Sequence, residues 1–369
     1  MPRKVAFIIG SFDGGGTEHY LVRLLRGLDR ERFEPVVVTL SNIGPLRDEV
    51  HRLAPVYVVQ LAGKLFNRQG RRELWRLRKM LRREAVSLVH VLIERAVVYG
   101  GIAGLIARVP VVASQRNTRS TMGSGLTFLY LLTLRHVARH IIPNAYQVEQ
   151  WLRAQGVRGT PVTVVHNGIP SERLRPVAER PVDASPVVIC SVGRLASAVK
   201  GQPLLLEAVQ ALLRAGKSVR LLIVGSGPDE ARLRERAGQL GVAEQVEWTG
   251  YLPDPMEAIE RSDICVLASY NEGFPNVVVE YFAAGRPVVA TAVGGVPEIV
   301  RQGENGLLVP PGSAGALSEA LARLVDDSEL RRRMGRNGRA LVERELTVDV
   351  EVGRTQEVYD RVLRERGKR

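Results

Sequence analysis

Two glutamates, Glu272 and Glu280, lie on either side of a proline-containing turn. Pro275 favours a helix start directly after it, which leaves Glu272 in the loop and places Glu280 about one turn into the helix. The first turn of a helix has free backbone N–H groups that favour an anion, and carboxylates accept hydrogen bonds from hydroxyls. The pattern indicates a ligand that is both polyhydroxyl and phosphorylated, such as a sugar nucleotide. The alternative, Glu280 as an ordinary surface residue, fits poorly with its apolar neighbours.

Two cations follow the apolar run at 187–192, which is predicted to be a strand. Arg194 comes directly after that run and Gly193, and Lys200 lies before the next helix-like segment. A guanidinium fork and an ammonium charge at the carboxyl end of a strand suit a diphosphate.

The two following runs also end in residues that suit a nucleotide. Gly225 permits close backbone approach, and Tyr251 with Leu252 offers a platform for a flat base. For each turn taken singly, an ordinary turn without a ligand is the alternative.

A glycine-rich stretch at 14–16 follows the first apolar run, at 5–9. Glycines let backbone N–H groups approach a phosphate at a helix N-terminus. A dinucleotide fingerprint needs a third glycine where this chain has His19, and no acidic residue closes the second run at 39–42. The stretch therefore favours a phosphate over NAD, with a tight turn that binds nothing as the alternative.

No metal site is predicted. His136 and His140 have i, i+4 spacing, but the glutamate of a zincin and a third nearby ligand are missing. The chain contains no Asp-x-Asp sequence, so a diphosphate bridged by a metal on that motif is not supported. The stretch 211–218 resembles a Walker A loop, but it has alanine in place of the first glycine and precedes a predicted strand.

Short β-branched runs alternate with amphipathic ones along the chain, as in βαβ units. In the first half, strands are predicted at 5–9, 35–40, 56–60, 87–92, 110–114, 140–143 and 162–165. In the second half, they are predicted at 187–192, 219–224, 246–248, 264–268, 287–291 and 306–309. Near-continuous apolar strands indicate parallel sheets buried on both faces. The fold class is α/β, with two doubly wound domains whose ligand is expected in a cleft between them.

The expected domains are residues 1–172 and 187–348, joined by a proline-containing linker at 173–186. A C-terminal helix at 349–369 follows, because the chain after Ser328 is helical and charged with no further strand.

The chain resembles retaining glycosyltransferases of family 4. The resemblance rests on the glutamate pair together with residues 193–195, 200–201, 225–227 and 294–298. Residues 14–16 and 167–169 also match that family's first-domain loop and domain-end signature, so the resemblance covers nearly the whole chain. It implies a GT-B architecture of two Rossmann-like domains facing across a cleft. The first domain would bind the acceptor and the second mainly the donor, and the last helix would pack back toward the first domain.

The resemblance also implies roles for individual residues. Arg194 and Lys200 would hold the diphosphate, and Glu280 the ribose hydroxyls. The other implied contacts are Glu272 with the backbone of Gly273, Phe274, Pro275 and Asn276 at the transferred sugar, Tyr251 and Leu252 at the base, Gly15, Gly16 and Gly225 at the donor, and His19 on the acceptor side. A UDP-sugar is the favoured donor and a GDP-sugar the second. The nucleotide sugar is a substrate rather than a cofactor, and the reaction would need no metal.

Two positions depart from the family's pattern. Members usually space the arginine and lysine one residue closer than Arg194 and Lys200, so this loop holds an insertion. Many members carry a histidine after the fifth strand, where this chain reads Gln115-Arg116-Asn117. A role that rests on that histidine does not carry over, and Arg116 becomes a candidate for an anionic substrate on the acceptor side.

The net charge of +13 is concentrated in the first half, where residues 1–175 hold 27 Lys and Arg against 12 Asp and Glu. Residues 68–83 alone hold eight cations and one acid, with leucines at helical spacing and Trp75 beside them. One interpretation is that this basic amphipathic helix, with the apolar stretch 126–134, rests on an anionic membrane surface. The alternative is a solvated outer helix whose arginines extend over its own core.

The stretch without charge at 120–134 is too short to span a bilayer, and the run at 5–9 is too short for a signal-peptide core. Cys190 and Cys265 lie in apolar runs and form no disulfide framework. A cytoplasmic protein is expected, peripheral on the inner face of the membrane and serving polysaccharide or glycolipid synthesis.

Two other functions stay open. A sugar-nucleotide epimerase of the same architecture would bind the same donor without an acceptor. A nucleic-acid-binding protein would explain the charge, although aromatic residues make up only 5% of the chain and no known module appears.

Overall fold

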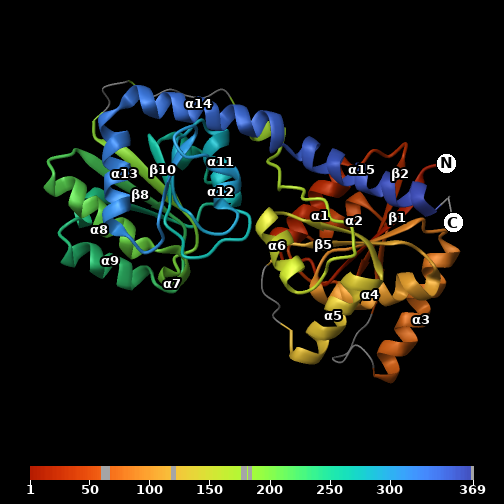
Figure 1. Ribbon diagram of the computed structural model, residues 1–369. Coiled ribbons are helices and arrows are strands. Elements are labelled where there is room, and N and C mark those ends of the chain that lie inside the picture. Colours follow the sequence, from red (N-terminus) through yellow and green to blue (C-terminus); the bar gives the residue numbers. More distant parts are fainter. Residues whose placement is uncertain (60–66, 118–121, 176–180, 182–184, 367–369) are drawn as a thin grey trace. The chain divides into compact units, whose positions relative to one another are not determined.

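The computed structural model, described for residues 1–59, 67–117, 122–175, 181 and 185–366, divides into two compact units (Figure 1). Unit 1 comprises Met1–Asn167 and Val348–Arg369, and unit 2 comprises Gly168–Thr347. Each unit is built on one parallel six-stranded sheet. Of the predicted linker at 173–186, residues 176–180 and 182–184 lie outside the described residues.

The sheet of unit 1 has the strand order β3-β2-β1-β4-β5-β6. Its strands are β1 (Arg3–Ile9), β2 (Phe33–Thr39), β3 (Val56–Val58), β4 (Leu88–Val91), β5 (Val111–Gln115) and β6 (Ala138–Pro143). Its helices are α1 (Gly16–Gly27), α2 (Arg47–Leu53), α3 (Arg68–Arg83), α4 (Glu94–Ala107), α5 (Ser124–His136), α6 (Tyr146–Ala154) and α15 (Val348–Arg366).

Both faces of this sheet are buried. Successive residues of β1 point to opposite faces, so Val5, Phe7 and Ile9 join a core with α1, α2 and α15. Ala6 and Ile8 join a second core with α3, α4 and α5. This burial on two sides explains the continuous apolar strands.

The sheet of unit 2 has the order β12-β11-β10-β7-β8-β9. Its strands are β7 (Val187–Val192), β8 (Val219–Val224), β9 (Val246–Gly250), β10 (Ile264–Leu267), β11 (Val288–Thr291) and β12 (Gly306–Val309). Its α-helices are α7 (Ser197–Lys200), α8 (Gln202–Arg214), α9 (Glu230–Gln239), α10 (Met256–Glu260), α11 (Asn276–Ala283), α12 (Val296–Ile299), α13 (Ala314–Asp326) and α14 (Ser328–Glu345), and its 3₁₀ helices are η1 (Ser171–Arg173) and η2 (Ala243–Gln245).

Every predicted strand except one overlaps an observed strand. The prediction at 162–165 is wrong, because this segment forms only a single bridge, between Val162 and Ile141 of β6. It does run beside β6, since Thr163 N–H donates to the Ile141 carbonyl at 3.1 Å. The ladder stops at Pro143, which has no N–H to donate back.

Candidate functional site

The loops that follow β7 and β8 pack against each other through their backbones. Leu195 N–H donates to the Ser226 carbonyl at 3.0 Å, and Gly193 N–H donates to the Val224 carbonyl at 2.9 Å. Gly225 has a φ of +134°, and a Cβ on it would lie 2.1 Å from the Gly193 carbonyl oxygen. The close backbone approach predicted for Gly225 is therefore explained by the packing of these two loops against each other.

Lys200 is the last residue of α7, a single helical turn in the loop after β7. Gly201 ends the turn with a φ of +66°, where a Cβ would lie 2.1 Å from the Ala268 carbonyl oxygen. Only glycine tolerates that conformation and that contact together. The turn is thereby held against the loop after β10, which carries Glu272.

Lys200 and Glu272 form an ion pair at the carboxyl end of the sheet. The Lys200 ammonium lies 2.6 Å from Glu272 Oε1, and the Ser269 hydroxyl donates to the same oxygen at 2.6 Å. The two charged side chains are 28% and 11% exposed, so water screens their attraction less than on an open surface. Both residues were predicted for the site, and the structure brings them together. A cation and a carboxylate side by side match the needs of a phosphorylated sugar.

Arg194 lies at the same end of the sheet. Its side chain is exposed and, among the residues that the structure describes, forms no ion pair. Its carbonyl accepts a hydrogen bond from Gln202 Nε2 at 2.9 Å, which fixes the loop backbone. Because the side chain is exposed, its guanidinium is accessible to an anion.

Helix α11 begins at Asn276, directly after Pro275, as predicted. The preceding loop is held in place, because the Gly273 carbonyl accepts from Gly295 N–H at 2.9 Å and Phe274 is buried. The positive end of the helix dipole thus lies between the two glutamates.

Glu280 lies one turn further along α11. Arg173 Nη1 donates to its Oε1 at 3.4 Å, and Arg173 Nη2 lies 3.6 Å from Asp254 Oδ1. Burial raises the pKa of Glu280, whereas the nearby Arg173 lowers it. Sequence reasoning missed Arg173 and Asp254, because Arg173 is 107 residues away from Glu280 in the chain. Arg173 pairs with both carboxylates through contacts that leave no local pattern.

The end of β9 lies beside these loops, since Gly225 N–H donates to the Gly250 carbonyl at 2.8 Å. Tyr251 follows directly and is 72% exposed, and Leu252 is half-buried. An exposed ring beside a half-buried apolar residue is suited to stacking on a flat base.

In unit 1, the stretch 14–16 forms the start of α1, with Gly15 as its N-cap and Gly16 as its first residue. A loop that sequence reasoning missed supports it, because Phe12 N–H donates to the Ile43 carbonyl at 2.9 Å. His19 is exposed in the first turns of α1. The loop presents backbone N–H groups at a helix N-terminus, the geometry that suits a phosphate.

Arg116 has internal partners. Its guanidinium lies 3.4 Å from the centre of the Tyr20 ring and 3.9 Å from Glu351 of α15, and it donates to Asn167 Oδ1. Burial lowers its pKa. These contacts fasten α15 to the sheet, and a role with an anionic substrate stays a prediction.

The two histidines with i, i+4 spacing, for which no metal site was predicted, lie in two different elements. His136 is exposed at the end of α5, whereas His140 is buried in β6 with Nε2 2.8 Å from Thr163 Oγ1. Burial, together with Arg361, lowers the pKa of His140 to about 4. Among the described residues, no three His, Cys, Asp or Glu side chains gather to hold a metal ion.

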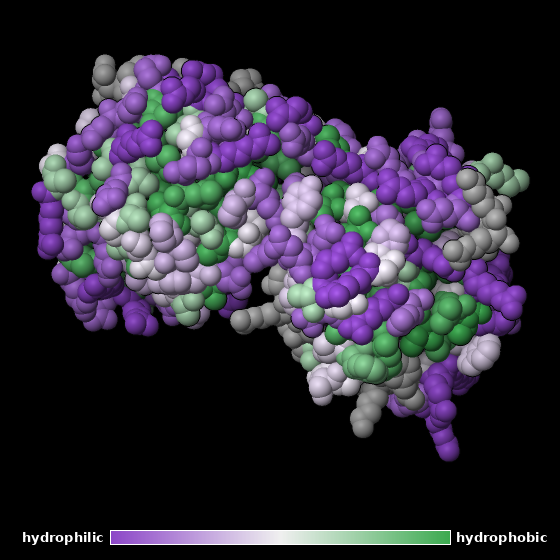
Figure 2. Space-filling view, viewed as in Figure 1, coloured by the Kyte–Doolittle hydropathy of each residue, from purple (hydrophilic) through white to green (hydrophobic). Residues whose placement is uncertain are grey.

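The basic amphipathic segment is helix α3, with the predicted bounds of residues 68–83. Leu77 and Leu81 are buried, whereas Trp75 is 60% exposed and Arg78 lies over its ring. Leu105 of α4 and Phe128 of α5 are also exposed. Figure 2 shows hydrophobic surface over α4 beside hydrophilic side chains over α3. In the part of the chain that the structure describes, no helix is long and apolar enough to cross a membrane.

Two family models match the chain. "Glycosyltransferase Family 4" matches residues 14–173, and "Glycosyl transferases group 1" matches residues 177–341.

Curated relatives match a part of the chain. An alpha-D-kanosaminyltransferase from Streptomyces kanamyceticus is 35% identical over 43% of this chain and 42% of its own length. A D-inositol 3-phosphate glycosyltransferase from Corynebacterium glutamicum is 40% identical over 40% of this chain and 37% of its own length. The match therefore spans less than half the length of these relatives.

Solved structures match nearly the whole chain. HepE from Anabaena in complex with UDP has a TM-score of 0.84 at 22% identity, over 97% of this chain and 99% of that one. The lipopolysaccharide outer core galactosyltransferase WaaB has a TM-score of 0.80 at 17% identity, again over 97% and 99%. With the two parallel six-stranded sheets, these likenesses confirm the expected GT-B fold.

Proposed function

The chain belongs to the group 1 glycosyltransferases of family 4, and from this premise we propose that it moves a sugar from a nucleotide diphosphate to a hydroxyl acceptor. The observation that supports this most is the Lys200–Glu272 pair beside the start of α11, with Glu280 one turn further on. A cation, the positive end of a helix dipole and two carboxylates together match a ligand that carries phosphates and hydroxyls.

We propose a UDP-sugar as the donor, with a GDP-sugar as the second candidate. HepE, which has this fold, is known in complex with UDP and with UDP-glucose. Unit 2 would bind the donor, with Tyr251 and Leu252 at the base and Glu280 at the ribose. The stretch 14–16 of unit 1 would lie at the donor phosphates, and His19 on the acceptor side.

In the proposed reaction, the bond between the sugar's anomeric carbon and the diphosphate oxygen breaks, and a bond to the acceptor oxygen forms on the same face. Negative charge grows on the leaving diphosphate, where Arg194 and Lys200 stabilise it. The acceptor's proton goes to a phosphate oxygen of the donor, so no side chain acts as general base. Because the two side chains supply positive charge, we propose that the reaction needs no metal.

Nucleotide binding tests the donor site directly. We expect UDP to raise the melting temperature, since a ligand at 100 times its Kd stabilises the native state by about 2.7 kcal/mol. The shift should survive a chelator and disappear in Glu280→Ala. Differential scanning fluorimetry with UDP, GDP, ADP and NAD measures it.

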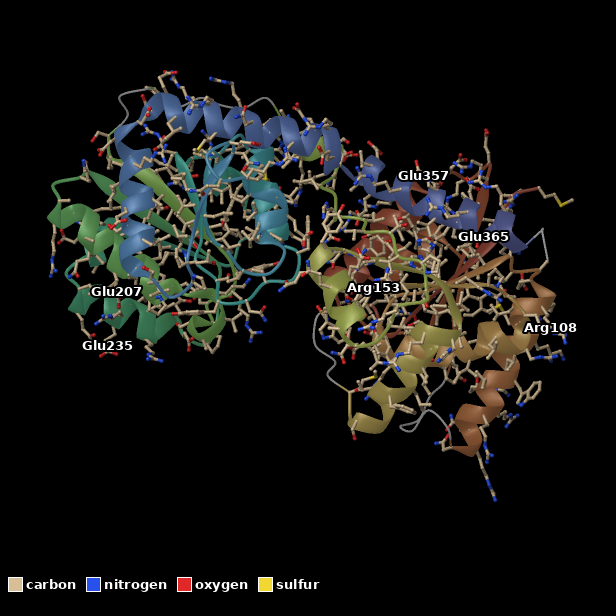
Figure 3. The ribbon with its side chains drawn as sticks, in the orientation of Figure 1. Arg108, Arg153, Glu207, Glu235, Glu357 and Glu365 are labelled. Atoms are coloured by element: carbon tan, nitrogen blue, oxygen red, sulfur yellow. The ribbon has the colours of Figure 1, made fainter. Side chains whose placement is uncertain are left out.

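Glu235→Ala is the matched control, because Glu235 is exposed on α9 and bonds only with the neighbouring side chain of Gln239 among the described residues (Figure 3). A shift with NAD alone would point to a dehydrogenase. An unchanged UDP shift in Glu280→Ala would remove Glu280 from the donor site.

We also propose that the protein works in cell-surface polysaccharide or glycolipid synthesis, as a cytoplasmic protein peripheral on the inner face of the membrane. Helix α3 carries eight cations, and the exposed Trp75, Leu105 and Phe128 lie on it and on the neighbouring helices α4 and α5. Cations are attracted to an anionic membrane surface, and apolar side chains insert into its interfacial region, so both kinds of side chain would contribute to membrane binding.

Vesicle binding tests this surface. We expect sedimentation with phosphatidylglycerol vesicles at low salt, and the double change Arg72→Glu with Arg82→Glu should weaken it at least about tenfold. Arg333→Glu with Arg336→Glu on α14 changes the net charge equally and should leave binding nearly unchanged. Equal losses in both double variants would show that only net charge matters.

A further inference from the structure

The segment that enters unit 2 at Gly168 is fastened to the helices that support Glu280. Ile169 N–H donates to the Leu346 carbonyl at 2.8 Å. Further along, Arg339 Nη1 of α14 donates to the carbonyls of Arg175, at 3.0 Å, and of Ala283 at the end of α11. The segment around Arg173 is therefore held at a fixed position relative to α11.

Arg173 uses this position to bind Glu280. Its Nη1 lies 3.4 Å from Glu280 Oε1, and its Nη2 lies 3.6 Å from Asp254 Oδ1. Asp254 is itself fixed, because its Oδ1 accepts from Met256 N–H at 3.1 Å at the start of α10. The guanidinium thus lies between two carboxylates, one of them anchored, and bonds to a single oxygen of the other.

We propose that Arg173 is a positioning residue for the donor, which orients the Glu280 carboxylate so that its second oxygen accepts from the ribose hydroxyls. In the described part of the chain, Oε2 of Glu280 accepts no hydrogen bond, so it is available. This inference rests on the proposed function, because it assigns a partner to the carboxylate of that donor site.

The charges around Glu280 make the proposal sensitive to pH. Arg173 and Asp254 face it, and the neighbouring Tyr281 is buried and stays neutral because burial raises its pKa well above the ordinary value. Burial raises the pKa of Glu280, and Arg173 opposes that rise. Loss of Arg173 should raise this pKa further, so the ionised carboxylate should form only at higher pH.

Binding of UDP at several pH values tests the proposal, with GDP used instead if GDP is the nucleotide that stabilises the wild type. Arg173→Ala should weaken binding about tenfold near neutral pH and move the acid limb of the binding profile to higher pH. Arg173→Lys should restore most of the affinity. Asp254→Asn, whose amide oxygen can still accept from Met256 N–H, should move the acid limb to lower pH.

Arg175→Ala is the matched control, because its exposed side chain lies in the same segment and only its carbonyl is bonded by Arg339. Wild-type affinity and an unmoved acid limb in Arg173→Ala would overturn the proposal. So would an equal loss in Arg175→Ala, since that would reflect the segment's folding. If the wild type itself binds no nucleotide, the proposed function fails rather than this inference alone.

Discussion

Lys200→Ala is expected to lower kcat by about 10²- to 10³-fold, the usual effect of removing one group that stabilises charge in a transition state. In the free protein the ammonium already lies 2.6 Å from Glu272, so its position is set before the donor arrives. The charge on the leaving diphosphate grows as the glycosidic bond breaks, so Lys200 should matter more for kcat than for donor affinity. Steady-state kinetics with the donor found by the binding screen measures both.

Lys217→Ala is a closely matched control for this prediction. Lys217 also makes an ion pair at 2.6 Å, with Asp326, and its side chain is 31% exposed against 28% for Lys200. It precedes β8 and therefore lies at the amino end of the sheet, away from the site. A kcat within about threefold of wild type in Lys200→Ala would contradict the assigned role, whereas equal losses in both variants would indicate a general effect on folding.

The sheets were predictable because the sequence of each strand alone shows that the strand is buried. A strand buried on both faces needs apolar residues at nearly every position. The runs 187–192 and 219–224, each with a single polar residue, meet that need without reference to a partner. The segment 162–165 has the same composition but lies beside Pro143, so its ladder depends on a residue elsewhere in the chain. The composition of a segment indicates whether the segment is buried, whereas its pairing into a sheet depends on the residues of the neighbouring strand.

The residues of the candidate site likewise divide into those that the local sequence predicts and those that depend on long-range contacts. Lys200 and Glu272 were found because each follows a recognisable strand, and carboxyl ends of parallel strands meet at one edge of a sheet. Arg173 and Asp254 follow no such rule, since the contacts of Arg173 to Glu280 and to Asp254 are set by how a connecting segment folds onto α11. The assignment of α15 to unit 1 likewise depends on long-range partners that periodicity does not reveal.

Glu351 of α15 is the centre of those long-range contacts. Its carboxylate is fully buried and accepts two hydrogen bonds from Arg23 of α1, at 2.7 and 3.0 Å. Arg116 lies 3.9 Å away, and its side chain is only 8% exposed. One carboxylate therefore balances two guanidinium groups in a poorly hydrated place, which is the arrangement most sensitive to loss of the single anion.

Glu351→Ala is accordingly expected to destabilise unit 1 by about 3–5 kcal/mol, because it leaves both cations without their counter-ion. For a unit of this size, that corresponds to a fall in melting temperature of about 10 °C. Differential scanning calorimetry should show the transition of unit 1 moving down while that of unit 2 stays in place. Glu357→Ala, on the exposed side of the same helix (Figure 3), should move neither. A normal transition for unit 1 in Glu351→Ala would mean that apolar packing alone holds α15.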